Sequence, residues 1–333
     1  MKTQIYQSNQ LNIKTCASLL REGEIVAFPT ETVYGLGANA FLPDSVKKIY
    51  EAKGRPSDNP LIVHIADKSW VDVVAEFVPN GAKKVIEKFM PGPVTVVLKK
   101  KKIVPDSVTG GLDTVAVRMP NSKVALDLIL EAGVPVCAPS ANTSSRPSPT
   151  TAGHVYDDLN GKICAILDGG ECEVGVESTV IDFTSEKPRL LRAGGMALEK
   201  IEEVVGEIEV VRNSKVALCP GMKYKHYSPS SDVYVALPNE NAIQRMVAFY
   251  EKCVSEGKKT VVIAMDEYTQ NFDKERFYNA GKTYEDYARK LFSLLRKSDD
   301  DGYDVVIAQG VEEKGIGSSI ANRLEKACGG KFI

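Results

Sequence analysis

The stretch Ile25-Val26-Ala27-Phe28-Pro29-Thr30-Glu31-Thr32-Val33-Tyr34-Gly35-Leu36-Gly37 places an apolar strand directly before a polar turn that contains two glycines. In α/β folds, ligands bind beyond the carboxyl ends of strands. Thr30 and Thr32 offer hydroxyl groups there, and Gly35 and Gly37 allow a close approach to the backbone. Taken alone, the segment is more typical of a simple strand-to-helix turn, so its meaning depends on what surrounds it.

The first two thirds of the sequence alternate short apolar runs with polar, helix-like stretches, which indicates an α/β fold. We predict strands at 25–28, 61–65, 94–98, 115–118, 134–138, 163–167, 179–183 and 189–191. We predict helices near 13–21, 44–53, 81–89, 122–132 and 151–158. Asp44 can cap the second helix, and Gly54 can end it. Strands this numerous, some separated only by short polar stretches, predict a twisted mixed sheet of parallel and antiparallel strands.

A second domain is predicted after residue 231, because the pattern becomes simpler there. Strands at 233–236, 260–264 and 304–308 alternate with helices near 240–255, 283–298 and 317–328, which predicts a small Rossmann-like α/β domain. The stretch 213–231 is rich in Pro, Gly, Ser and Lys without a clear period, so it reads as a linker. We therefore expect a larger first domain at 1–212, a linker at 213–231 and a second domain at 232–333. Gly315-Ile316-Gly317 lacks a third glycine in register and predicts close helix packing.

Composition narrows the classes of protein. The 333 residues carry 42 Lys and Arg against 44 Asp and Glu, a net charge of −2, so overall charge does not favour a nucleic-acid binder. The run Lys99–Lys102 is more typical of a solvated strand end than of a binding patch. Seven cysteines without a CxxC pair predict free thiols in a reducing compartment. No signal peptide or membrane span is evident, so we expect a cytoplasmic protein.

Two buried-looking ionisable residues stand out in predicted strands. His64 is the one imidazole in Leu61-Ile62-Val63-His64-Ile65, on the face opposite Leu61, Val63 and Ile65, and is most simply a hydrogen-bonded core histidine. Arg118 ends the apolar strand Val115–Arg118. An arginine is rarely buried without an anion, and its fork geometry suits a carboxylate ligand. Arg118 is thus the stronger of the two signals.

Other polar residues follow helices and strands. Lys53 and Arg55 flank Gly54 after a predicted helix, and Pro56 makes the backbone at Arg55 extended. A phosphate clamp and a solvated helix end explain this pair equally well. Ser140 and Asn142 follow the strand at 134–138. Neither GxxxxGK[ST] nor a strand-linked GxGxxG occurs in the first domain, and the three histidines are far apart, so no P-loop, Rossmann or metal site is predicted there.

Taken together and in order, these segments resemble the threonylcarbamoyl-AMP synthase family with its YrdC-type catalytic domain. The resemblance covers about residues 8 to 200 and rests on PTETVYGLG, KGRPSDNPL, HI, MPGPVT, VAVRMP, APSAN and GVESTV. HYSP at 226–229 and the C-terminal domain resemble the longer, two-domain branch of the family. The resemblance implies a YrdC-like mixed sheet that encloses a cavity.

The resemblance also implies a reaction. L-threonine, bicarbonate and ATP would give L-threonylcarbamoyl-AMP and pyrophosphate, with Mg²⁺ accompanying ATP. The product would pass to the machinery that modifies adenosine 37 of tRNA (t6A), so an RNA contact is conceivable, and no membrane is involved. Residues at family positions for L-threonine are Thr32, His64, Arg118, Ala138 and Ser178. Those at ATP positions are Arg55, Asn59, Thr114 (or Val115), Ser140, Asn142, Ser148, Arg192 and Tyr227, and the catalytic pair is Lys53 and Arg55.

The implied chemistry needs positioning and charge rather than a covalent intermediate. The threonine amine becomes a carbamate, whose oxygen attacks the α-phosphate of ATP and expels pyrophosphate. Lys53 and Arg55 would stabilise the growing negative charge, Arg118 would hold the carboxylate, and Thr32 or Ser178 would read the hydroxyl. The linker with Tyr227 would close the cavity against water.

Two alternatives stay open at this point. A concave basic surface could make the chain a binding module for double-stranded RNA or tRNA. A related enzyme of the hydrogenase-maturation type makes a carbamoyl-adenylate, but such chains also carry acylphosphatase-like and zinc-finger modules, which are not evident in this sequence.

Overall fold

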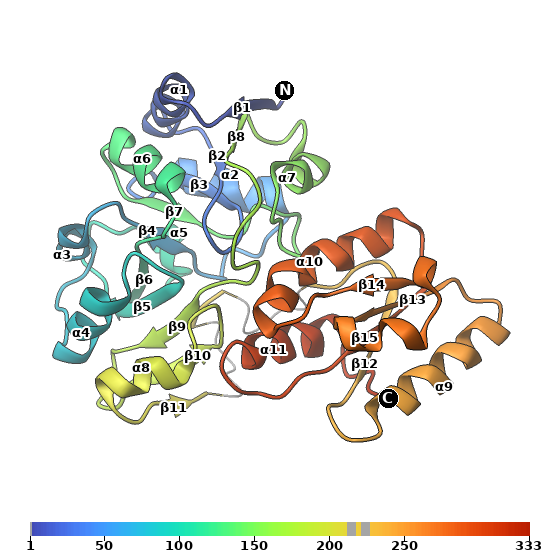
Figure 1. Cartoon of the computed structure of the whole chain (residues 1–333). Helices are drawn as coiled ribbons and strands as arrows, with labels where there is room; N and C mark the ends of the chain where they lie inside the picture. The colour runs from blue at the N-terminus through green and yellow to red at the C-terminus, as the bar shows by residue number, and fades with distance from the viewer. Residues whose placement is uncertain (1, 212–217, 221–226) are drawn as a thin grey trace. The chain divides into compact units, whose positions relative to one another are not determined.

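The computed structural model describes residues 2–211, 218–220 and 227–333, and it forms two compact units. The first unit contains Met1–Ser144, Ser148–Glu173 and Glu177–Lys223, and the second contains Ser145–Pro147, Val174–Val176 and Tyr224–Ile333 (Figure 1). Much of the predicted linker at 213–231 lies outside the described residues, so the linker and its boundaries stay a prediction.

The first unit is built on a sheet of eleven strands in the order β1-β8-β2-β3-β7-β4-β6-β5-β9-β10-β11. The strands are β1 (Gln4–Gln7), β2 (Val26–Phe28), β3 (Gly35–Asn39), β4 (Ile62–His64), β5 (Val94–Lys99), β6 (Thr114–Arg118), β7 (Val136–Ala138), β8 (Ala165–Asp168), β9 (Thr179–Asp182), β10 (Arg189–Arg192) and β11 (Glu209–Val210). Strand β4 runs parallel to β6 and antiparallel to β7. The predicted mixed sheet is confirmed.

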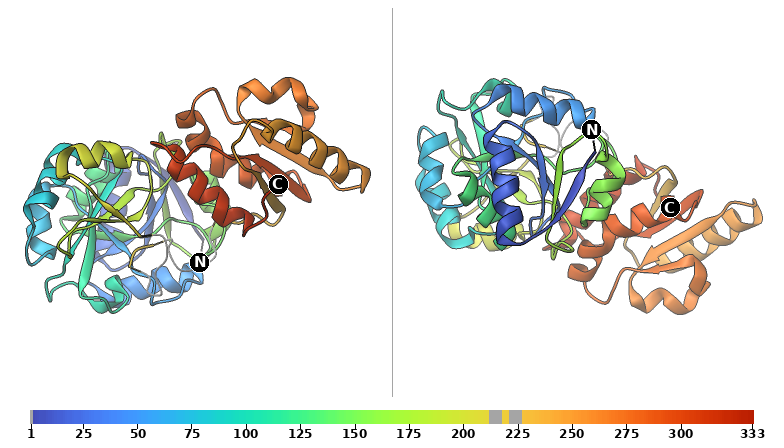
Figure 2. Two further views of the ribbon diagram at one scale, coloured as in Figure 1. Left: turned by 90° about the horizontal axis from the view of Figure 1, so that it is seen from below. Right: turned by 90° about the horizontal axis from the view of Figure 1, so that it is seen from above.

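Helices cover both sides of this sheet, as Figure 2 shows from two directions. They are α1 (Gln10–Arg21), α2 (Pro43–Lys53), α3 (Val71–Val74), α4 (Asn80–Phe89), α5 (Asp106–Thr109), α6 (Lys123–Ala132), α7 (Ala152–Leu159) and α8 (Leu198–Val205). Helices α1 and α6 pack together on one face, where Leu20 and Leu128 meet Phe28. The larger core lies on the other face, beneath α2, α4, α7 and α8.

Strand β3 was not predicted, because glycine weakens a strand and the segment Gly35–Asn39 reads as a turn. Tertiary packing explains why glycines stand there. A Cβ atom on Gly37 would lie 2.7 Å from a Val136 methyl group and 2.8 Å from the Phe28 ring. The two neighbouring strands therefore fill the space that a side chain on β3 would need.

Helix α2 ends as predicted but begins differently. Gly54 adopts φ 61° and ψ 39°, the left-handed conformation that glycine tolerates, and it ends the helix. The predicted cap at Asp44 was wrong, since the N-cap is Leu42 without a side-chain hydrogen bond. Asp44 instead lies in the first turn and pairs with Lys47 at 2.8 Å. The positive end of the helix dipole stabilises its negative charge there.

The second unit contains a separate parallel sheet in the order β12-β15-β13-β14. Its elements are β12 (Asp232–Ala236), α9 (Ala242–Ser255), β13 (Thr260–Ala264), β14 (Phe277–Asn279), α10 (Tyr284–Asp300), β15 (Val305–Gln309) and α11 (Gly317–Cys328). The predicted small α/β domain is confirmed. The predicted element order lacked β14, whose three residues are too few to show an apolar run.

Two short segments from the first two thirds of the sequence belong to this second unit. Arg296 Nη2 donates to the carbonyl of Pro147 at 2.5 Å, and the backbone N–H of Ser228 donates to the carbonyl of Ser145 at 2.9 Å. Close packing is also found at Gly317, where a Cβ would lie 2.2 Å from the carbonyl oxygen of Glu312 and 3.2 Å from Tyr284. The packing role predicted for this segment therefore holds at Gly317, whereas a Cβ on Gly315 would meet no atom within 4 Å.

Within the described ranges, every helix is too short or too polar to cross a lipid bilayer. All seven cysteines are free thiols, as predicted.

Gly194 is expected to be required for the stability of the first unit. A Cβ there would lie 2.2 Å from Ser178 C and Thr179 N, two backbone atoms that cannot move without displacing β9. We expect Gly194→Ala to lower the free energy of unfolding by about 1–3 kcal/mol. Thermal or urea unfolding measures this change.

Gly153→Ala provides the matched control. Gly153 lies in α7, is exposed, and its added Cβ would meet no atom closer than 3.6 Å. Because alanine favours helix over glycine by about 1 kcal/mol, this variant should be as stable as the parent or slightly more so. Equal destabilisation of the two variants would contradict the close-approach explanation.

Candidate active site

Polar side chains from four strands lie in one row across the first sheet. His64 on β4 lies beside Arg118 on β6. Strands β5 and β6 pair Val96 with Val117, so one step further Thr95 falls opposite Arg118. Thr95 pairs with Val180 on β9, and Val180 pairs with Arg192 on β10. The sheet register therefore joins residues from five strands, of which β9 contributes the apolar Val180.

The row lies on the face of the sheet that is opposite the larger core. Val63 and Val117, one residue before His64 and Arg118, belong to that core, and side chains alternate between the two faces. On the face of the row, the apolar neighbours are Ile62, Val97, Ala116, Val180 and Leu191, which pack with Cys219 rather than with a helix. This part of the face is therefore where the first unit gathers its polar site residues.

Arg118 is held by the turn between β2 and β3. Its Nη1 atom donates to Thr32 Oγ1 at 2.8 Å, and its Nη2 atom lies 2.7 Å from Glu31 Oε2. The side chains of Arg118 and Glu31 are only 4% and 3% exposed. The sequence predicts a carboxylate ligand for Arg118, and the structure shows a carboxylate of the chain itself, Glu31, in contact with it. Glu31 was missed, although its place inside PTETVYGLG was a signal.

His64 is buried and uncharged. Its Nδ1 atom lies 3.1 Å from the carbonyl oxygen of Ile62, and its ring meets Phe28 edge-on with centroids 6.0 Å apart. Burial, reinforced by the positive charge of Arg118, lowers the pKa of His64 to about 3. The imidazole is therefore neutral near physiological pH. It presents a weakly polar surface and does not act as an acid.

Ser178, which precedes β9, connects the row to β10. Its hydroxyl shares a 2.7 Å hydrogen bond with Thr95 Oγ1. Arg192 Nη2 donates to the carbonyl of Ser178 at 2.9 Å and to its hydroxyl at 3.2 Å. Sequence reasoning missed Thr95, although it is a hydroxyl residue in an otherwise apolar strand and the last residue of MPGPVT.

A second polar group lies around the end of α2. Lys53 is 2% exposed, and its Nζ atom donates to the carbonyls of Ser140 at 2.6 Å and Asn142 at 2.5 Å. The Ser140 hydroxyl donates to Asn142 Oδ1 at 2.5 Å. Lys53 therefore organises the loop after β7, so three predicted site residues form one hydrogen-bonded cluster.

Arg55 lies at the same edge of the sheet. Its Nη2 atom donates to the carbonyls of Pro60 at 3.1 Å and Asn59 at 3.3 Å. Ile62 pairs with Ala116 on one side and Ala138 on the other, so Thr114 and Ser140 fall beside Pro60 by continuation of the register. Pro60 and His64 are four residues apart along one chain, about 13 Å at the usual rise of a strand.

The remaining predicted residues have different surroundings. Ser148 is buried and donates to Glu177 Oε1 at 2.6 Å, next to Ser178 in sequence. Tyr227 belongs to the second unit, where its ring stacks on Phe292 at 5.1 Å and lies 5.7 Å from the Arg323 guanidinium. Its φ of 63° is rare for a tyrosine. His226 lies outside the described residues.

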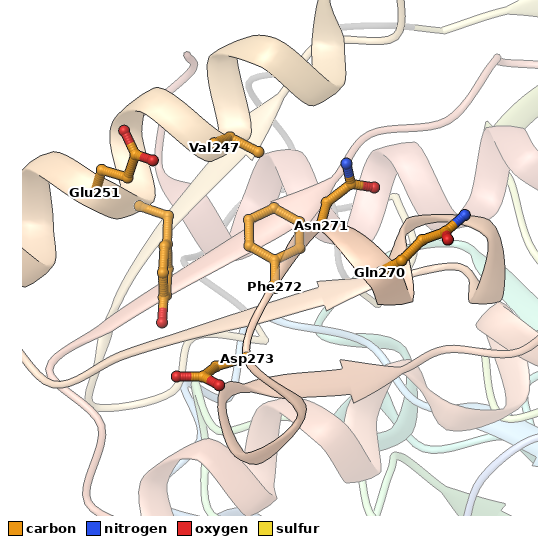
Figure 3. Close-up of a pocket in the computed structure, with 7 residues that line it drawn as sticks. Val247, Glu251, Gln270, Asn271, Phe272 and Asp273 are labelled. Carbon is orange, nitrogen blue, oxygen red and sulfur yellow. The ribbon is translucent and has the colours of Figure 1, made fainter.

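A depression in the second unit contains none of the predicted residues. Figure 3 shows its lining: Val247 and Glu251 come from helix α9, and Asn271, Phe272 and Asp273 are consecutive residues of a loop. The polar chemistry predicted from the sequence, apart from Tyr227, therefore belongs to the first unit.

The chain matches two family models. A model described as "Telomere recombination" (Sua5, YciO and YrdC) matches residues 18–194, which is more than half of the chain. A second, described as "Threonylcarbamoyl-AMP synthase, C-terminal domain", matches residues 196–329.

Known proteins match over nearly the full length. The chain is 50% identical to the threonylcarbamoyl-AMP synthase of Pyrococcus abyssi, covering 96% of this chain and 95% of that protein. It is 45% identical to the Bacillus subtilis threonylcarbamoyl-AMP synthase, covering 98% and 95%. The crystal structure of P. abyssi Sua5 complexed with L-threonine superposes with a TM-score of 0.95, at 48% identity and 99% coverage of both chains. The chain therefore belongs to the threonylcarbamoyl-AMP synthase family.

Proposed function

We propose that this chain condenses L-threonine, bicarbonate and ATP into L-threonylcarbamoyl-AMP and pyrophosphate. The proposal rests above all on the row His64–Arg118–Thr95, which sits beside Ser178 and Thr32 on one face of the sheet. Full-length similarity to threonylcarbamoyl-AMP synthases, one of them solved with L-threonine, supports the same reaction. The product would then pass to the machinery that transfers the threonylcarbamoyl group to adenosine 37 of tRNA.

L-threonine is assigned to the row. Arg118 offers the guanidinium that suits its carboxylate, and Ser178 and Thr32 offer hydroxyls for its side-chain hydroxyl. Neutral His64 and small Ala138 would form the wall of this subsite. Because a buried polar group left without its partner costs free energy, this arrangement would disfavour amino acids that lack the hydroxyl.

ATP is assigned to the opposite end of the same strands. Arg55 would face the phosphates, while Lys53 acts through the loop it binds, which carries Ser140 and Asn142. Of the other predicted nucleotide contacts, Asn59 and Thr114 lie at this end, Ser148 and Arg192 lie next to Ser178, and Tyr227 stays a prediction from the sequence. The separation of about 13 Å between Pro60 and His64 suits an amino acid placed alongside a nucleotide.

Mg²⁺ is proposed to arrive with the phosphates of ATP. In the part of the chain that the structure describes, no cluster of carboxylate, histidine or cysteine side chains is arranged to hold a metal ion. The protein residues at the proposed phosphate end are cationic or neutral, so the ion's ligands would be phosphate oxygens and water. No protein residue is assigned to it.

The catalytic work of the chain would be positioning and charge stabilisation. The carbamate oxygen attacks the α-phosphate, the bond to the leaving pyrophosphate breaks, and Arg55 stabilises the negative charge that develops. No protein nucleophile is required.

The first test omits each substrate in turn. With L-threonine, bicarbonate and ATP present, pyrophosphate should be released, because adenylation needs the carbamate as nucleophile. With any one absent, release should fall to background. Salt-dependent RNA binding without ATP turnover would instead favour the binding-module alternative, and pyrophosphate release with ammonium in place of threonine would favour the carbamoyl-adenylate alternative.

The second test replaces Arg55 with alanine. Removing one donor to a developing negative charge typically lowers kcat by a factor of about 10²–10³. Pyrophosphate release by Arg55→Ala should fall by that order while thermal unfolding shows a folded protein. Lys47→Ala, a change at an exposed cation of helix α2, which precedes Arg55, should leave the rate unchanged. Intact release by Arg55→Ala would refute the phosphate role.

A further inference from the structure

We propose that Glu31 receives the α-ammonium group of the amino-acid substrate and removes a proton from it, so that the nitrogen can attack CO₂. This inference rests on the proposed function, because it assigns one step of that reaction to a residue outside the substrate contacts described above. An α-ammonium group has no free lone pair at neutral pH, so carbamate formation needs a base.

The backbone around Glu31 is fixed before any ligand binds. Thr30 Oγ1 accepts hydrogen bonds from the N–H groups of Thr32 and Val33, both at 3.2 Å, and donates to the carbonyl of Val33 at 2.6 Å. Thr30 is 4% exposed and Glu31 5%. A turn pinned in this way holds the carboxylate in a defined position instead of letting it swing into solvent.

The Glu31 carboxylate has acceptor capacity to spare. Its Oε2 atom lies 2.7 Å from Arg118 Nη2, but neither carboxylate oxygen accepts a hydrogen bond from any residue that the structure describes. An ionised carboxylate has about four lone-pair sites, and buried polar atoms rarely stay unsatisfied. An ammonium group brings three donors and a positive charge, which is the ligand chemistry that this carboxylate lacks.

Arg118 and Glu31 together match the charge pattern of an α-amino acid. In the substrate, the carboxylate and the ammonium group are attached to the same carbon atom. If Arg118 binds the carboxylate, the ammonium group lies within reach of the side chain that contacts Arg118. The buried pair is therefore complementary to a zwitterion, with a cation for one end and an anion for the other.

The proton transfers balance without another reagent. Glu31 takes one proton from the ammonium group and becomes a neutral carboxylic acid. It returns that proton to the hydroxyl of bicarbonate, whose C–O bond breaks to release water and CO₂. The amine lone pair then forms the N–C bond with CO₂, an oxygen takes up the π electrons, and the second N–H proton leaves to water. Glu31 ends as a carboxylate.

The groups that face Glu31 keep constant charges during these steps. Arg118 on β6 stays cationic, and the pKa of neighbouring His64 lies at about 3. Burial, followed by the negative charge of Glu31, raises the pKa of the Cys172 thiol well above its usual value. Among these four groups, Glu31 is the carboxylate, and it is placed beside Arg118 to receive the ammonium proton.

Glu31→Gln provides the test, because it keeps the shape and removes the base. Pyrophosphate release at neutral pH should fall by about a hundredfold. The ratio of variant rate to wild-type rate should then rise between about pH 7 and 9, since the substrate amine increasingly loses its proton unaided. A structural counter-ion would give a ratio that does not change with pH, and that result would overturn the proposal.

Glu24→Gln provides the matched control. Glu24 carries the same carboxylate just before β2, is 36% exposed and pairs with Lys48, so its variant should keep the wild-type rate and pH profile. If Glu31→Gln does not fold, Glu31→Asp replaces it. Aspartate retains the charge and the base, so the rate should fall while the ratio to wild type stays flat with pH. A rising ratio for Glu31→Asp would contradict the proposal.

The reverse half-reaction separates this proposal from the proposed function. ATP formation from threonylcarbamoyl-AMP and pyrophosphate requires no proton transfer at the amine. Glu31→Gln should therefore retain it, whereas Arg55→Ala should lose it. Loss of ATP formation in Glu31→Gln would overturn the base assignment, and failure of the wild-type protein to form ATP would refute the proposed function itself.

Discussion

The register of β7, β4, β6 and β5 is the constraint on which the candidate site depends. Strands β4, β6 and β5 contribute His64, Arg118 and Thr95, and β7 leads into the loop of Ser140 and Asn142. This arrangement requires that Val63 pairs with Val117 and Cys137. A slip by one residue would turn every side chain of a strand to the opposite face. The apolar residues buried on the core face make such a slip costly, so hydrophobic packing on one side of the sheet positions the polar chemistry on the other.

Buried charge is the second organising feature. Arg118 and Glu31 are almost fully removed from solvent, and such pairs contribute little net stability because desolvation offsets their attraction. The chain nevertheless places Glu31 in a turn fixed by Thr30 and Arg118 on β6 beside it. A buried, incompletely satisfied pair is better explained by ligand binding than by folding, since an apolar pair of similar size would serve the fold equally well.

Lys53 holds the loop after β7 through hydrogen bonds to its backbone. The sequence predicts a phosphate clamp or a solvated helix end, but its ammonium group is buried and bound to two carbonyls of the loop after β7. Its side chain thereby sets the positions of Ser140 and Asn142. Arg55, two residues later, follows the left-handed Gly54 and leaves the helix in a new direction. The glycine between the two cations thus gives them different surroundings, and a catalytic role for both stays a prediction.

The sequence by itself determined the α/β class, the two kinds of sheet and most elements, because apolar periodicity and turn residues are local properties. It also singled out Arg118, since a cation in an apolar strand needs an anion wherever the strand lies. Only the tertiary structure decided that this anion is Glu31, that Thr95 joins Ser178, and that the glycines of β3 form a strand. Those outcomes depend on pairing between segments distant in sequence, such as Thr95 and Ser178, and local pattern does not contain that information.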